Sequence, residues 1–391
     1  MDEEQFVELF AIGQGLPGPT STQLVVSTAL SRAGPIAGLS ALALWNLPGL
    51  VILTTCGVLL TAYVDPDDPP FWLVGLPPAA IALVFKAFYG FTKNFDKLEL
   101  SLCLFSHLIA ILINGDARIP SDSSQYVFPI LLVVGGLVTY VDSRREKPFS
   151  TYNSPSQGWD AESDATMKRI GIPLWVGGLL FFLWIAILVL VICLVNVANL
   201  TNVYLEIFEL MFRIGSIIFG GGQVVIPLLQ DYVVPKWMTK DQFLQGLGLA
   251  QSMPGPLFNF AAYLGAVYQG VPGALVAFLG IFGPGVILIF AVAPFWARLR
   301  HFRWFKSTLK GVNATSIGLI SAACIILWEA AITDAADAMV FSVAAFMAVV
   351  LDIGAPFVIL GGGVFGAILH QDALNLGQVS YCVKNGYTEV E

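Results

Sequence analysis

Gln14-Gly15-Leu16-Pro17-Gly18-Pro19 recurs 237 residues later as Gln251-Ser252-Met253-Pro254-Gly255-Pro256. The match continues outside this hexapeptide at Gln5-Phe6 with Gln242-Phe243, at Pro35 with Pro272 and, one gap later, at Pro48-Gly49 with Pro284-Gly285. Proline and glycine both interrupt a helix, so each copy carries a helix break at a matching position. The chain therefore contains an internal duplication of a whole structural unit.

The composition is that of a membrane protein. Hydrophobic residues make up 57% of the chain and charged residues only 12%, and the mean hydropathy is +0.78. Apolar runs at 71–91, 172–197 and 311–331 are long enough to cross a bilayer, whereas the runs at 99–114 and 126–141 are short. We predict an all-α polytopic membrane protein with about eleven or twelve membrane segments.

The distribution of basic residues predicts the orientation. Lysine and arginine are concentrated in a polar stretch at 142–170 and in a loop at 297–310, whereas the opposite loops at 65–70, 201–202, 269–270 and 333–337 carry none. Only Arg118 and Lys384 fall outside this pattern. Positive loops face the cytoplasm, so we place both stretches there. One crossing per apolar run then makes 36–63 and its counterpart 272–296 run in opposite directions. We predict inverted repeats, because the run at 172–197 adds one extra crossing.

This pattern favours transport. Two inverted halves with interrupted helices at matching positions are typical of secondary transporters, whose binding site lies at the repeat interface. The expected organisation is a first repeat at 1–141, a polar cytoplasmic connector at 142–170, and a linking helix with the second repeat at 171–391.

A run of three glycines is the first candidate binding element. Gly220, Gly221 and Gly222 precede Gln223 in an otherwise apolar segment. Such backbone is tolerated at membrane depth only where it is buried in protein or lines a cavity, and its exposed amides suit an anion. Close helix packing through small residues is the alternative interpretation.

The two Pro-Gly-Pro copies are the second candidate element. A helix that starts there offers free N–H groups and a partial positive charge to an oxyanion. A purely structural kink is the alternative. The residues that we assign to binding are Gln14, Pro17, Gly18, Thr20 and Ser21 at the first copy, and Gln251, Pro254, Gly255 and Asn259 at the second.

Charged residues inside apolar runs are functional candidates by default. Arg213 has the planar fork that matches an oxyanion, but Glu206 and Glu209 share its helical face, so it is a ligand of the substrate or the partner of a carboxylate. Lys86 is a candidate buried cation, unless it extends to the membrane surface. Glu209 and Glu329 are candidates for coupling to protons.

The ordered set of motifs resembles the chromate ion transporter family. It comprises Phe-Arg-Ile-Gly-x-x-x-Phe-Gly-Gly-Gly at 212–222, Val-Ile-Pro at 225–227, Trp237, Thr239, Phe243 and both Pro-Gly-Pro copies. The resemblance implies a two-half plasma-membrane carrier of chromate, with sulfate as the isosteric natural anion. The chain departs from the family in one respect: Met1 aligns with Met238, so the first repeat lacks a counterpart of about 203–237. A shortened form, a misassigned start and an asymmetric variant all stay open.

Three classes of function remain to be compared. A secondary carrier is favoured, coupled to protons, a counter-anion or the membrane potential. A non-transporting scaffold subunit is the main alternative, and a membrane-embedded enzyme is the weakest, since no nucleotide-binding, hydrolase or metalloprotease motif is present. We expect no cofactor, no metal and no nucleic acid as partner. The lipid bilayer is an expected partner, and a homodimer stays open.

Overall fold

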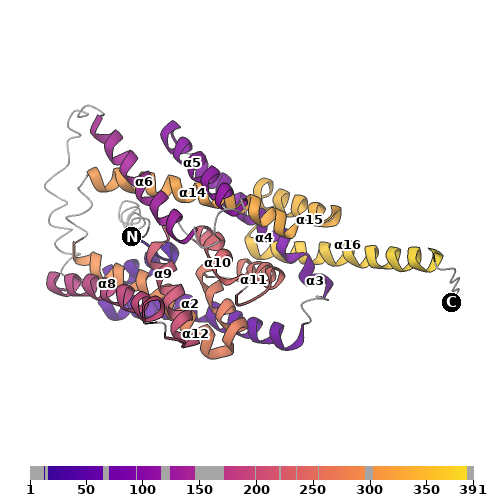
Figure 1. Cartoon of the computed structure of the whole chain (residues 1–391), viewed down its shortest axis with the longest axis horizontal. Coiled ribbons are helices and arrows are strands. Elements are labelled where there is room, and N and C mark those ends of the chain that lie inside the picture. The colour runs from indigo at the N-terminus through magenta and orange to yellow at the C-terminus, as the bar shows by residue number, and fades with distance from the viewer. Residues whose placement is uncertain are drawn as a thin grey trace.

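The computed structural model describes residues 13, 16–64, 70–93, 95–115, 124–145, 171–198, 200–219, 222–234, 236–253, 255–295 and 303–384. Figure 1 shows their arrangement; within these ranges all regular secondary structure is helical. The first half of the chain forms α2 (Thr20–Tyr63), α3 (Phe71–Val74), α4 (Leu76–Thr92), α5 (Lys97–Gly115) and α6 (Ser124–Arg145). The second half forms α8 (Leu174–Asn196), α9 (Val203–Ile217), η2 (Gly222–Val224), α10 (Val225–Val233), α11 (Lys240–Ser252), η3 (Leu257–Asn259), α12 (Phe260–Val292), η4 (Ala293–Phe295), α14 (Arg303–Ala331), α15 (Ala335–Ala345), the π-helical turn η5 (Phe346–Val350) and α16 (Ala355–Lys384).

The all-α membrane class is confirmed. Within the described ranges, six helices are long and apolar enough to cross a membrane. This number is smaller than the eleven or twelve segments expected, because several of the apolar stretches form short helices and others are the arms of interrupted ones. The six candidate spans are Thr20–Tyr63, Trp72–Thr92, Val127–Arg144, Leu174–Asn196, Leu257–Phe295 and Ser307–Ala331.

The two longest spans are hairpins rather than straight helices. The backbone of α2 leaves the helical region at Gly34 (φ 81°, ψ −172°), and that of α12 leaves it at Gly270 (φ 61°, ψ −154°). In α12 a Cβ at Gly265 would overlap the carbonyl oxygen of Gly273. Residues eight apart in a continuous helix are about 12 Å apart, so the two arms must fold back on each other.

The helices form two groups, which Figure 1 separates clearly. One group contains α2, α8, α9 and α12, and the other contains α4, α5, α6, α14, α15 and α16. Helices α10 and α11 lie between the groups; α11 touches α4, α16 and α12. Each group draws helices from both halves of the chain.

Helices of the second group cross at small residues. A Cβ at Gly311 of α14 would overlap the carbonyl oxygen of Gly135 of α6. A Cβ at Gly75, just before α4, would overlap the carbonyl oxygen of Gly362 in α16. In the membrane, where lipid is as apolar as leucine, close backbone approach of this kind supplies much of the attraction between helices. Glycine at these crossings is therefore a packing requirement.

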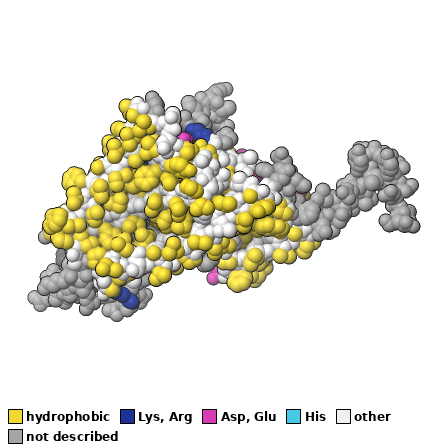
Figure 2. Space-filling model, turned by 90° about the horizontal axis from the view of Figure 1, so that it is seen from below, with side chains coloured by type: hydrophobic (Ala, Val, Ile, Leu, Met, Phe, Trp, Pro, Cys, Tyr) yellow, Lys and Arg dark blue, Asp and Glu magenta, His cyan; other side chains and the backbone are white. Residues whose placement is uncertain are grey.

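The outer surface fits a lipid environment. Figure 2 shows one face of the molecule covered almost continuously by hydrophobic side chains, with the visible charges near its margins. Large apolar side chains such as Trp175 and Phe182 of α8 and Leu104 of α5 are exposed. A surface of this size would associate in water, so it is explained by contact with the bilayer.

Candidate functional site: a junction of interrupted helices

Both Pro-Gly-Pro copies are turns that begin a helix. Gly18 has φ +118° and Gly255 has φ +115°, a conformation that only glycine adopts without strain. The chain enters α2 at Thr20 directly after the first copy and η3 at Leu257 directly after the second, 237 residues later. Neither helix start has a side-chain cap, because the preceding residues are Pro19 and Pro256.

Both Pro-Gly-Pro regions pack against the Pro-Gly pair of the opposite half, the first through its turn and the second through Asn259, which follows the turn. A Cβ at Gly18 would lie 2.8 Å from Cα of Gly285, and one at Gly285 would lie 2.8 Å from Cδ of Pro19. In the same way, a Cβ at Gly49 would overlap the Asn259 side chain, which follows the second turn. The hairpins α2 and α12 therefore cross each other through equivalent contacts.

The end of α9 joins this crossing. The Gly18 amide donates a hydrogen bond to the carbonyl oxygen of Ile218, which caps α9, at 2.8 Å. On the far side of the glycine run, a Cβ at Gly222 would lie 3.0 Å from Cβ of Leu257. The carboxyl end of α9, Gly222 and both Pro-Gly-Pro turns therefore form one junction, although Gly220, Gly221, Gln14 and Pro254 lie outside the described residues.

Two glutamines extend the junction towards α4. Gln223 Nε2 lies 3.5 Å from Gln251 Oε1, and Gln251 Nε2 donates to the carbonyl oxygen of Ala80 at 2.9 Å. Both glutamines were predicted from the sequence, and the structure brings them together. Their amides connect η2 and α11 to α4 of the second group.

Buried polar side chains gather beside the two helix starts. Thr22 is 1% exposed and its hydroxyl lies 3.4 Å from Oδ1 of Asn46, which is 0% exposed. Gln23 donates from Nε2 to the carbonyl oxygens of Pro17 (2.8 Å) and Gly285 (3.5 Å). Asn46 was not among the predicted site residues; the signal that could have found it is an amide within an apolar run two residues before Pro48.

Asn259 is the least satisfied of these side chains. It is 2% exposed, and neither its Oδ1 nor its Nδ2 has a hydrogen-bond partner among the described residues. Thr20 is also buried, and its hydroxyl has no hydrogen-bond partner within the described ranges, whereas Ser21 is exposed. Buried amides are nearly always hydrogen-bonded, so Asn259 needs an explanation. A ligand between the crossing hairpins would supply one.

The charged candidates behave differently from one another. Arg213 Nε lies 2.7 Å from Glu209 Oε1, which settles its partner as Glu209 of the two carboxylates on its face. Lys86 pairs with Asp352 at 2.7 Å and its side chain is 35% exposed, so it is not the buried cation that its apolar run suggested. Its long side chain reaches an exposed carboxylate in the turn before α16. Glu329 is exposed near the carboxyl end of α14.

An open groove of about 710 Å³ lies near the start of α9 and is lined by Leu200, Thr201, Asn202, Tyr204, Leu205, Phe208 and Val276. The junction itself offers two uncapped helix starts and several neutral amides and hydroxyls. Such groups bind an oxyanion through hydrogen bonds and helix dipoles without a bare cation.

A sequence model of the family described as Chromate transporter matches residues 1–140 and 205–367. A probable chromate transport protein of Synechococcus elongatus is 23% identical over 85% of this chain and 77% of its own length. A chromate transport protein of Pseudomonas aeruginosa is 26% identical over 83% of this chain and 72% of its own. An uncharacterized transporter of Methanocaldococcus jannaschii is 23% identical over 83% and 75%. No solved structure matches the chain.

Proposed function

This chain belongs to the chromate transporter family, and we propose that it is a secondary carrier that moves chromate and sulfate-like tetrahedral oxyanions across the plasma membrane. The matched family and the relatives named as chromate transport proteins support transport of chromate rather than catalysis. We place residues 142–170 and 297–310 on the cytoplasmic side, following the distribution of basic residues.

One observation carries the assignment of the site. Asn259 presents an amide without a partner among the described residues, 2% exposed, at the crossing of two interrupted helices. The uncapped starts of α2 and η3 add N–H groups on either side. An anion entering the junction would exchange its hydration shell for these donors, and sulfate has the same shape and charge as chromate.

The reciprocal crossing supports alternating access as the mechanism. The first Pro-Gly-Pro turn contacts Gly285 of the opposite half, and Asn259, which follows the second turn, contacts Gly49. If the halves are inverted in the membrane, exchanging their conformations moves the junction from one side to the other. Rocking of the α2–α12 group against the α4–α14 group would act on the junction through Gln223 and Gln251, which link it to α4.

Transport is driven by a proton gradient, by a counter-anion gradient or by the membrane potential, since the sequence contains no nucleotide-binding motif. Of the two coupling candidates, Glu209 is buried in α9, where it pairs with Arg213, and Glu329 is exposed near the carboxyl end of α14.

The decisive experiment measures radiolabelled chromate uptake into proteoliposomes, with excess sulfate as competitor. Asn259→Leu is the test variant: because the amide has no partner in the described part of the fold, an apolar side chain of similar size costs little stability. Thr315→Val is its matched control, a buried hydroxyl of α14 without a hydrogen-bond partner among the described residues, away from the junction.

We expect the wild-type protein to show saturable chromate flux that sulfate inhibits. The flux should fall at least about tenfold in Asn259→Leu, which corresponds to the loss of about 1.4 kcal/mol of binding free energy. It should persist in Thr315→Val. Flux by Asn259→Leu equal to that of the wild type would remove the junction as the site. No flux by the folded wild-type protein would contradict the carrier function itself.

A further inference from the structure

Arg213 is held on three sides by residues of its own helix and of α10. Its Nε lies 2.7 Å from Glu209 Oε1 and its Nη2 lies 3.4 Å from Glu209 Oε2, so both oxygens of the carboxylate meet the same edge of the guanidinium. Nη1 donates to the Tyr232 hydroxyl at 3.1 Å, and the guanidinium carbon lies 4.9 Å from the centre of the Tyr232 ring. These contacts use the fork and the face of the guanidinium together.

The three residues span the glycine run. Glu209 and Arg213 lie one turn apart on α9, which ends at Ile217, and Tyr232 lies near the end of α10, which starts at Val225. Gly222 and Gln223 lie between these helices and touch Leu257 and Gln251 of the second Pro-Gly-Pro region. The angle between α9 and α10 thus determines how Gly222 and Gln223 face the junction.

The charges of this cluster balance within the protein. The Glu209 side chain is 4% exposed and that of Arg213 is 20% exposed. Separating such a pair leaves a buried carboxylate without its counter-charge, which is far more costly than losing an exposed pair. An anion that drew the guanidinium away would have to bear this cost.

We propose that Arg213 is a positioning residue and not a ligand of the transported anion. With Glu209 and Tyr232 it clamps α9 to α10 and holds Gly222 and Gln223 against the second helix start. The effect on transport rests on the proposed function. The clamp itself rests on the contacts of Arg213 with Glu209 and Tyr232. Recognition of the oxyanion then falls to the neutral donors of the junction.

The test compares Arg213→Gln, Glu209→Gln and the double variant Glu209→Gln/Arg213→Gln in the complete chain. Lys86→Gln serves as the control, because Lys86 pairs with a carboxylate that is 87% exposed. Chromate KM and maximal flux are measured in proteoliposomes for each variant. The melting temperature of each protein is measured in detergent, which needs no transport.

Each single variant leaves one buried charge, so we expect it to raise the chromate KM at least about tenfold and to lower the melting temperature. The double variant keeps neutral amides at both positions. Its chromate KM should return to within about threefold of the wild-type value, and its melting temperature should recover as well. Lys86→Gln should change neither.

Two results would overturn the proposal. A double variant with the same raised KM as Arg213→Gln would show that the anion itself needs the guanidinium. Single variants that melt and transport like the wild type would show that no clamp exists. If the wild type carries no chromate, the carrier function fails, yet the melting temperatures still decide the clamp: recovery in the double variant supports it and no recovery rejects it.

Discussion

Individual glycines determine where this chain can turn inside the membrane. Gly18 and Gly255 adopt positive φ at repeat-related turns, and Gly34 and Gly270 do so at the tips of the two hairpins. Each position uses a backbone conformation that an L side chain rarely adopts. At Gly18 space is restricted as well, since a Cβ would approach Cα of Gly285 to 2.8 Å.

Gly18→Ala should therefore destabilise the protein by about 1–3 kcal/mol, because it adds backbone strain and a contact that the backbone of α12 cannot relieve. The melting temperature in detergent measures this effect. Gly90→Ala is the control, as a Cβ at this helical position meets nothing within 4 Å. It should change stability by about 1 kcal/mol or less, in the stabilising direction. Equal effects of the two substitutions would contradict the assigned strain.

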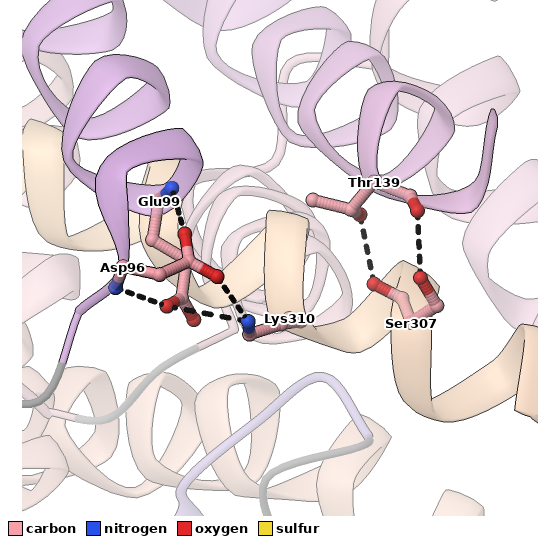
Figure 3. A network of polar contacts seen from close by, with 5 residues as sticks. All are labelled: Asp96, Glu99, Thr139, Ser307 and Lys310. Carbon is pink, nitrogen blue, oxygen red and sulfur yellow. Dashed lines mark hydrogen bonds and ion pairs between the residues drawn. The ribbon is translucent and has the colours of Figure 1, made fainter. Parts of the chain in front are cut away.

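At the scale of elements, α14 is attached to α5 and α6 by polar contacts that Figure 3 shows together. Thr139 Oγ1 donates to the Ser307 carbonyl at 2.7 Å, and Ser307 Oγ donates to the Thr139 carbonyl at 2.6 Å. Lys310 of α14 pairs with Asp96 and, at 3.5 Å, with Glu99 at the start of α5. These pairs fix the register between helices whose apolar surfaces alone would allow sliding.

The Asp96 pair makes stability depend on pH. Hydrogen bonding from Lys310 lowers the pKa of the Asp96 carboxyl below its ordinary value of 3.8. The folded state therefore gains stability above this ordinary value and loses it as the pH falls through the lowered one. The carboxylate is about half exposed, so the gain is below about 1 kcal/mol.

Asp96→Asn tests this dependence, because asparagine keeps the helix cap but removes the charge. We expect a slightly lower melting temperature at pH 7 and a smaller further decrease between pH 5 and about pH 3 than in the wild type. Asp142→Asn removes the same charge from an exposed position of α6 and is the control. Parallel pH curves for the wild type and Asp96→Asn would contradict the assignment.

At the scale of the whole molecule, the two halves of the chain are interlocked. Hairpin α2 crosses hairpin α12 through Gly49 and Gly285, and α14 rests on α5 and α6 while α4 rests on α15 and α16. Neither half forms a group of helices by itself. Movement of one half therefore changes the surroundings of the other.

The orientation of the molecule can be tested with single cysteines in a background without the five natural ones. Cysteine at Ser150 lies in the basic connector and cysteine at Asp67 in an acidic loop. Basic loops remain cytoplasmic, so we expect an impermeant maleimide to label Asp67→Cys in right-side-out vesicles and Ser150→Cys only in inside-out ones. Labelling of both positions from the same side would contradict the predicted topology.

Several features could be predicted from the sequence because they depend on local chemistry. Composition alone predicted helices in a membrane, and proline with glycine marked the positions where helices would start. The motifs identified the family, which the comparison confirmed. The sequence predicted separate apolar runs at 36–63 and 272–296, which begin next to Gly34 and Gly270, where the backbone turns. The packing of the two arms of each hairpin against each other is shown only by the structure.

What the sequence by itself determined is thus the environment, the duplication, the helix starts and the family. Only the tertiary structure decided the partners: Gly18 against Gly285, Asn259 against Gly49, Lys86 with Asp352 and Arg213 with Glu209 rather than Glu206. The physical reason is the distance along the chain over which each effect acts. A residue's backbone preference acts within its own turn, whereas a contact across 200 residues depends on which faces of two helices meet when all of them pack.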